Sequence, residues 1–306
     1  MMTPFTQTKT WADMNEYYNG LEPKIFNDAE ISCLFGSDRK HASWTSFNGP
    51  VASGKASDQD FSNFLTELRK AAKKNNTHQI YFRSLPPLRE WPLEFENELR
   101  EFGFKRQEWK TLITDLTVSE EKLLKCFEHS ARKGIKKAVS LGVIVEKCSG
   151  FDQYFSDFLI PYYKTTERPL KEKEFYRKGW LLDTENIYHY WVAKDSMGEP
   201  LGFLGTYTYD GIATEIMSAL TLLAFEKKIP AQDILHWEVI KYHKNVGDLY
   251  FDLAGFNPNP TSEKEKNIKR FKEKWGGKIY DVSSYYLDNR SFLQKIILKM
   301  RGKINA

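Results

Sequence analysis

The chain has 306 residues, which is long enough for two domains. Of these residues 41% are hydrophobic and 15% aromatic, a composition typical of globular proteins. The formal net charge of +4 is too small to indicate nucleic-acid binding by itself. The three cysteines, Cys33, Cys126 and Cys148, lack CxxC spacing, and the six histidines are scattered, so we expect reduced thiols, no disulfide framework and no metal site.

The first residues do not combine a basic segment with an apolar run, and no stretch approaches the length that spans a bilayer. These features predict a cytoplasmic protein. Strand-like runs at residues 31–35 and 42–47 open the chain, followed by a turn rich in glycine and serine.

The next pattern is an internal duplication. Residues 60–116 are predicted to form a helix, a strand, a proline-containing loop, a charged helix and a second strand. The same order of elements returns in residues 231–287. Two similar α/β halves predict two domains, which we place at residues 1–145 and 146–306.

Between the repeats, the amphipathic run at 120–142 predicts one basic helix that joins the halves. Strands with hairpin turns are expected at 188–194, 201–209 and 214–224. The expected fold class is therefore α+β, with a mixed sheet in the second half.

Residues 49–56 come close to a P-loop, with Gly49, Gly54 and Lys55 at the required spacing. The next residue is Ala56, so the hydroxyl that would bind magnesium is absent and nucleotide hydrolysis is not favoured. We interpret Lys55 as a substrate contact on a loop or as part of a polar hairpin. The sequence contains no GxSxG or HExxH motif that would indicate covalent or zinc catalysis.

Residues 251–277 hold the richest set of candidate side chains. Asp252 falls at the carboxyl end of a predicted strand, where open α/β sheets present side chains to ligands. Phe271 and Lys272 follow on a predicted helix that ends at the pair Gly276-Gly277. By pattern alone, a solvated Lys/Glu helix that packs through its apolar residues is the simpler interpretation.

The C-terminal run 290–303 contains five basic residues, no acidic residue and apolar residues at helical spacing. Such a basic amphipathic helix either rests on anionic lipid, giving peripheral membrane contact, or docks against its own domain.

Three stretches, at residues 111–145, 249–256 and 268–277, resemble the Fem family of peptidoglycan bridge-forming aminoacyltransferases. Residues 111–145 are similar to that family's strand, acidic helix start and basic stretch that leads to Gly-Val. LYFDLAGF at 249–256 and IKRFKEKWGG at 268–277 resemble its strand end with an aspartate and its Phe-Lys helix that ends at a glycine. The resemblance covers most of the chain and implies two tandem GNAT-like (acyl-CoA N-acyltransferase-like) domains with mixed, largely antiparallel sheets.

The resemblance also implies a reaction: transfer of an aminoacyl or acyl group to an amine of a peptidoglycan or other cell-envelope precursor, with no tightly bound cofactor. It assigns stabilisation of the reacting carbonyl to Lys272, beside Phe271, because a fixed cation stabilises the oxyanion that acyl transfer develops. Asp252 is the candidate general base for the acceptor amine.

Three further cations are candidates for binding an anionic group of the substrate. Arg168 is similar to the family's arginine that contacts the phosphates of a nucleotide-linked acceptor. Lys227 and Lys228 precede the predicted helix at 231 and are expected to serve the same phosphates.

The sequence leaves the donor open. The coiled-coil arm found in several Fem enzymes has no counterpart here, which weakens the case for aminoacyl-tRNA. Acyl-CoA is the alternative donor, with an amino sugar of a surface polysaccharide as acceptor, but residues 225–232 replace the glycine-rich pyrophosphate loop of a GNAT domain. A third possibility is a non-catalytic module that binds an anionic glycan, a lipid head group or RNA.

Overall fold

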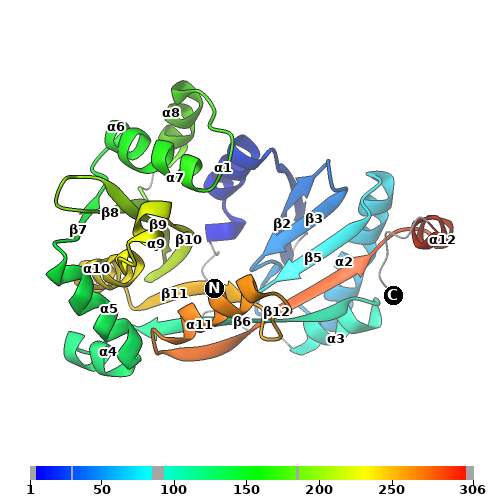
Figure 1. Cartoon of the computed structure of the whole chain (residues 1–306). Helices are drawn as coiled ribbons and strands as arrows, with labels where there is room; N and C mark the ends of the chain where they lie inside the picture. Colours follow the sequence, from blue (N-terminus) through cyan, green and yellow to red (C-terminus); the bar gives the residue numbers. More distant parts are fainter. Residues whose placement is uncertain (1–4, 29, 85–92, 184–185, 301–306) are drawn as a thin grey trace. The chain divides into compact units, whose positions relative to one another are not determined.

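The computed structural model describes residues 5–28, 30–84, 93–183 and 186–300. The chain forms two compact units (Figure 1). The first combines Met1–Trp109 with Asp281–Ala306, and the second is Lys110–Tyr280. Each unit contains helices and a largely antiparallel sheet, so the expected α+β class is confirmed.

The first unit is built on a sheet with the strand order β1-β2-β3-β5-β12, in which β3 and β5 run parallel and the other neighbours antiparallel. The short strand β4 pairs with β2. The strands are β1 (Glu22–Asn27), β2 (Ile31–Asp38), β3 (Ser43–Phe47), β4 (Val51–Ala52), β5 (Gln79–Arg83) and β12 (Lys278–Asp288).

The helices of this unit are η1 (Phe5–Gln7), α1 (Lys9–Asn19), α2 (Asp58–Lys74), α3 (Leu93–Glu101) and α12 (Phe292–Met300). Helix α2 begins at a capping box, in which Ser57 and Asp60 satisfy each other's backbone N–H groups. Its apolar residues Phe61, Leu65 and Leu68 recur at helical spacing and are buried in the core of the unit.

The second unit has the strand order β6-β11-β10-β9-β8-β7, in which only β10 and β11 run parallel. The strands are β6 (Lys105–Asp115), β7 (Ile144–Lys147), β8 (Tyr188–Lys194), β9 (Pro200–Tyr209), β10 (Ile212–Leu220) and β11 (Tyr250–Phe256). The α-helices are α4 (Glu120–Cys126), α5 (His129–Ser140), α6 (Phe151–Gln153), α7 (Ile160–Thr165), α8 (Lys173–Leu182), α9 (Leu222–Glu226), α10 (Ala231–Val246) and α11 (Glu263–Glu273), and the π-helical segment η2 is Tyr154–Leu159.

Helix α10 organises the core of the second unit. It packs against α5, β8 and β9 and ends at Gly247, whose φ of 96° suits only glycine well. Both of its histidines are buried. His243 Nδ1 lies 2.8 Å from Asp248 Oδ2, and Nε2 lies 3.0 Å from Thr206 Oγ1, so this histidine fastens the end of the helix to β9 and the following turn.

The predicted duplication is present in the order of elements. The first repeat forms α2, β5, α3 and β6, and the second forms α10, β11, α11 and β12. The last strand of each repeat, however, pairs with the central strand of the other: β6 pairs with β11, and β12 pairs with β5. The compact units therefore do not divide at 145/146, because residues 110–145 belong to the second unit and 281–306 to the first.

Two predicted elements differ from the structure. The helix expected at 120–142 is interrupted, because the backbone at Phe127 is extended, its ring is buried against Trp275, and Glu128 N–H donates to Lys274 O at 2.8 Å. The strand expected at 214–224 ends at Leu220, because Thr221 caps the short helix α9.

Candidate functional site

Strands β10 and β11 both become irregular at one place in the second unit. They pair in parallel over residues 212–214 and 250–252. Immediately beyond, β10 has a register shift against β9 after Glu215, and β11 has one against β6 before Gly255. Ala254 in this second bulge has a φ of 61°. Bulges redirect side chains and are frequent beside active sites, so this place is a candidate functional site.

Asp252 lies at the start of the β11 bulge, and its side chain is buried. Its Oδ1 atom accepts a hydrogen bond from Thr111 Oγ1 at 2.5 Å and one from the N–H of Ala254 at 2.9 Å. Burial raises the pKa of Asp252 to about 6, although both hydrogen bonds and the charge of Lys272 act in the opposite direction. The carboxyl group can therefore take up and release a proton near neutral pH.

Lys272 lies in the last turn of α11, which begins at a capping box formed by Ser262 and Glu265. Its Nζ atom donates to the carbonyl oxygens of Ala254 at 3.1 Å and Gly255 at 3.0 Å. Burial lowers the pKa of Lys272, and the negative charges of Glu215 and Asp252 oppose this effect. The ammonium group is thus fixed over the same bulge that contains Asp252.

A fully buried histidine contacts Phe271, the residue that precedes Lys272. The His236 ring stacks on Trp275 at 5.2 Å between centroids and meets Phe271 edge-on at 5.0 Å. Its Nδ1 lies 2.8 Å from Gln232 O, and its Nε2 lies 3.2 Å from Glu215 Oε2. Phe271 therefore forms part of an aromatic wall beside Lys272.

His236 and Glu215 contact each other in this wall. Burial opposes ionisation of Glu215, yet the hydrogen bond from His236 and the charges of His236 and Lys272 leave its pKa below the ordinary value. Ser218 Oγ donates to the other carboxylate oxygen at 2.7 Å.

The end of α11 is held against neighbouring backbone, as the predicted glycine pair requires. Gly276 and Gly277 have φ values of 63° and 97°. A Cβ at Gly276 would lie 2.4 Å from the carbonyl oxygen of Cys126, and one at Gly277 would lie 2.5 Å from that of Ile113. This contact, which only glycine permits, positions the helix that carries Lys272.

The structure thus brings together Lys272, Asp252 and Phe271 and places the other predicted residues on exposed loops. Arg168 follows α7, near Tyr163, whose phenol pKa burial raises to about 12 while the arginine charge acts to lower it. Lys227 and Lys228 lie exposed between α9 and α10, where Lys228 O accepts a hydrogen bond from Lys137 Nζ at 2.9 Å.

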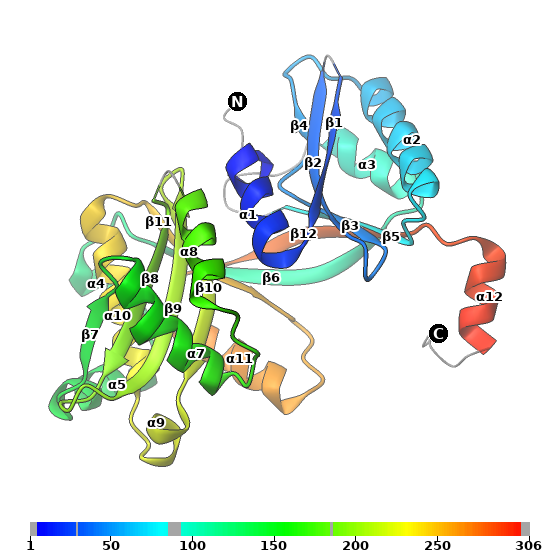
Figure 2. The same cartoon turned by 90° about the horizontal axis from the view of Figure 1, so that it is seen from above.

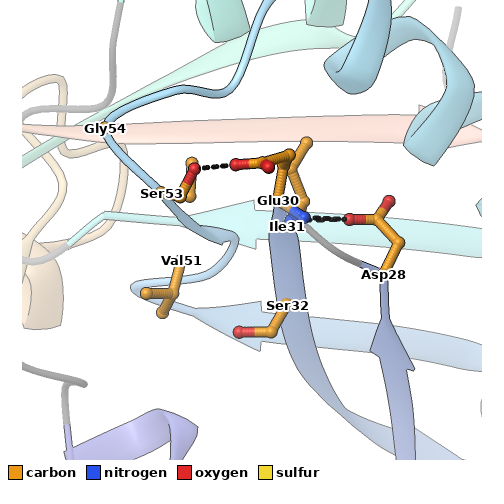
Figure 3. A pocket seen from close by; sticks show the side chains of 8 residues that line it. Asp28, Glu30, Ile31, Ser32, Val51, Ser53 and Gly54 are labelled. Carbon is orange, nitrogen blue, oxygen red and sulfur yellow. Dashed lines mark hydrogen bonds between the residues drawn. The ribbon is translucent and has the colours of Figure 1, made fainter.

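Lys55 lies in the first unit, beside a pocket of about 430 Å³ (Figure 3). The Lys55 N–H donates to Ser53 Oγ at 3.1 Å. Asp28 and Glu30 give the pocket an acidic wall, which does not favour anions. The pocket is lined by Asp28, Glu30, Ile31, Ser32, Val51, Ala52, Ser53 and Gly54.

Sequence reasoning missed Thr111 and Glu215 and left His236 without a role. An acidic residue within the apolar strand ATEIMSAL and a histidine within an apolar helix were the available signals. Within the described residues, no group of three or more His, Cys, Asp or Glu side chains is placed to hold a metal ion, and all three cysteines are free. No helix in the part of the chain that the structure describes has the length and apolarity to cross a membrane.

No family model matches the sequence, and no curated protein matches it. Solved structures do match. FemX has a TM-score of 0.66 at 14% identity, covering 97% of this chain and 94% of that chain. The C-terminal domain of a putative lysylphosphatidylglycerol synthetase from Agrobacterium fabrum has a TM-score of 0.61 at 14% identity, with the same coverage.

A tandem GNAT protein from the clavulanic acid biosynthesis pathway has a TM-score of 0.59 at 10% identity, covering 89% of this chain and 83% of that chain. At such identities the likeness establishes the fold. The expected Fem-like fold of tandem GNAT-like domains is therefore confirmed over nearly the whole chain.

Proposed function

We propose that this chain is an acyltransferase in which an acceptor amine attacks an activated acyl carbonyl directly. The observation that carries the proposal is the pairing of a cation and a titratable acid on one bulge of β11. Lys272 and Asp252 are bound to the C=O and the N–H of the same residue, Ala254. Acyl transfer needs a cation where negative charge develops on oxygen and a base for the amine proton.

The reaction balances with these two groups. The amine nitrogen forms a bond to the acyl carbon, and the carbonyl oxygen becomes an oxyanion beside the Lys272 ammonium group. The bond to the donor's leaving oxygen or sulfur then breaks. The amine proton passes to Asp252, whose Oδ2 atom accepts no hydrogen bond from the described residues, and from there to the leaving group.

The wall of Phe271, Trp275 and His236 supports this chemistry in two ways. Through Phe271, the chain neighbour of Lys272, it contributes to the buried surroundings of this lysine, and low-dielectric surroundings strengthen the interaction of the ammonium with an oxyanion. It also holds Glu215 as a carboxylate, whose charge helps Lys272 to stay protonated despite burial.

For the substrates, we infer aminoacyl transfer to an amine of a peptidoglycan or other cell-envelope precursor in the cytoplasm. Similarity in fold to FemX, together with the Phe-Lys motif at Lys272, supports this choice. The name of the lysylphosphatidylglycerol synthetase points to transfer of an aminoacyl group in a second neighbour. The donor is then a charged tRNA, and no tightly bound cofactor is needed. An acyl-CoA donor with an amino-sugar acceptor is the alternative, supported by the likeness to a tandem GNAT protein.

Exposed cations are available for the phosphates of such substrates. We assign Arg168, Lys227 and Lys228 to an anionic acceptor and Lys55 to a further substrate contact in the other unit. Each is exposed and is therefore expected to contribute more to substrate affinity than to the chemical step.

The test is amide formation by the purified chain, with charged tRNAs or acyl-CoA species as donors and a UDP-linked muropeptide or an amino sugar as acceptor. Transfer from charged tRNA would support the Fem-like reaction, and transfer from CoA the alternative. If the chain transfers from neither donor but binds an anionic glycan or RNA, and Lys272→Met leaves that salt-dependent binding intact, the chain is a binding module and the proposal is wrong.

A further inference from the structure

Helix α12 leaves an apolar face uncovered. The exposed fractions of Phe292, Leu293, Ile296, Ile297 and Met300 are 77%, 71%, 39%, 47% and 83%. At about 100° per residue, these five positions share one arc of roughly 140°, so they form a single face. Among the described residues, neither hydrophobic core includes any of them.

The start of the helix, in contrast, is well anchored. The Arg290 guanidinium donates two hydrogen bonds of 2.8 Å to the carboxylate of Asp288, the last residue of β12. Lys295 Nζ donates to the Asp288 carbonyl at 3.1 Å, and Ser291 and Gln294 bond each other at the first turn. The two views show α12 beyond the end of β12, apart from α2 and α3 (Figure 2). The helix is therefore held in place while its apolar face stays open.

The charged residues in the sequence of this segment are all basic. Between Asp288 and residue 306 the sequence has no aspartate or glutamate. It has five basic residues: Arg290, Lys295, Lys299, Arg301 and Lys303. A short helix with one apolar face and exclusively basic charge has the composition of segments that lie in the interface of an anionic bilayer.

We propose that α12 binds the surface of an anionic lipid bilayer, with its apolar face at the boundary between head groups and acyl chains. The basic residues of this segment that do not bond Asp288 then contact the head-group phosphates. A second copy of the chain is a less suitable partner for this face than a bilayer. A stable dimer interface uses about 20 to 30 residues per partner, and this face offers five. Two copies of a helix without acidic residues would also repel each other. The proposal does not depend on the acyl-transfer reaction, since its readout is binding alone.

The test is co-sedimentation of the full chain with vesicles of phosphatidylcholine, with and without phosphatidylglycerol, at low and high salt. We expect binding to the anionic vesicles only, and release at high salt. The double variant Leu293→Ser, Ile297→Ser should bind at least about tenfold more weakly, because it removes apolar side chains that would enter the bilayer. Its thermal unfolding should match the wild type, since neither side chain contributes to a core.

Ile25→Ser is the matched control, because Ile25 is an apolar side chain of β1 in the same unit with an exposed fraction of 66%. This variant should bind like the wild type. Equal vesicle binding by wild type and double variant, or equal wild-type binding to neutral vesicles, would overturn the proposal. So would a wild-type dimer, seen by light scattering, that the double variant converts to a monomer.

Discussion

The Nζ atom of Lys272 lies 3.1 Å from the carbonyl oxygen of Ala254, whose φ of 61° places it in the left-handed region. The N–H of the same residue donates to Asp252 at 2.9 Å. One irregular residue of β11 therefore sets the positions of a cation and an acid together. Because a shift of this bulge would move both groups together, the position of Lys272 relative to Asp252 would be preserved.

Replacing Lys272 by methionine tests the oxyanion role. We expect amide formation to fall by about 10²- to 10³-fold, the usual loss when one oxyanion donor is removed. Lys269→Met is the control, since Lys269 lies on the same helix and its Nζ atom bonds the carbonyl of Pro258. Rates are measured under single-turnover conditions. If both variants lose activity equally, or if Lys272→Met loses activity only in proportion to folded protein, the assigned role is wrong.

Replacing Asp252 by asparagine separates function from stability. The folded-state pKa of about 6 exceeds the ordinary 3.8, so ionisation of this buried acid costs stability as pH rises from 3.8 to 6. Asparagine removes this cost, which amounts to at most about 3 kcal/mol above pH 6. We expect loss of transfer together with a higher midpoint of urea unfolding at pH 7.5, and no stability difference near pH 4. A variant that is less stable at pH 7.5 would contradict the assignment.

The pH dependence of the transfer rate should reflect the ionisation of both Asp252 and Lys272. The rate is expected to rise with pH up to about 6 as Asp252 ionises, and to fall again at a pH below 10.5 as Lys272 loses its proton. Thr111→Val removes a hydrogen bond that lowers the pKa of Asp252, so it should move the acid limb to higher pH. Measurement of kcat/KM across this range checks the prediction. An acid limb that stays unchanged in the Thr111 variant would exclude Asp252 as the base.

Gly134 tests the packing of α5 on α10. A Cβ there would lie 1.8 Å from Asp233 Oδ2, and Asp233 is itself paired with Lys274. Alanine normally favours a helix interior by about 1 kcal/mol, but here overpacking costs about 1–3 kcal/mol and the ion pair must move. Gly134→Ala should therefore lower the unfolding temperature. Gly150→Ala, where the added Cβ meets nothing within 4 Å, should leave it nearly unchanged.

Part of the fold could be predicted from local patterns. The repeated order of helix, strand, helix and strand depends on apolar periodicity and turn residues, which neighbouring residues encode. The exchange of β6 and β12 could not be predicted, because the partner of a strand is set by contacts between residues far apart in sequence. The interruption at Phe127 was missed for a similar reason: its cause is the burial of the ring against Trp275, a tertiary contact that overrides helix propensity.

The candidate site was predictable only in outline. The resemblance pointed to Lys272 and Asp252, and the structure places both on one bulge. Glu215 and His236 could not be assigned, because a single acid in a strand and a single histidine in a helix have no spacing that indicates a partner. Their pairing depends on how α10 packs on β10, which the sequence pattern does not specify.

The exchange of final strands has a consequence during synthesis. Strand β5 is complete at Arg83, but the strand that covers its second edge, β12, ends at Asp288. At roughly 5–20 residues per second, a ribosome needs about 10 to 40 s to make the intervening chain. Throughout that interval β5 presents an open edge to other nascent chains, so the first unit acquires its closing strand only after the second repeat has been translated.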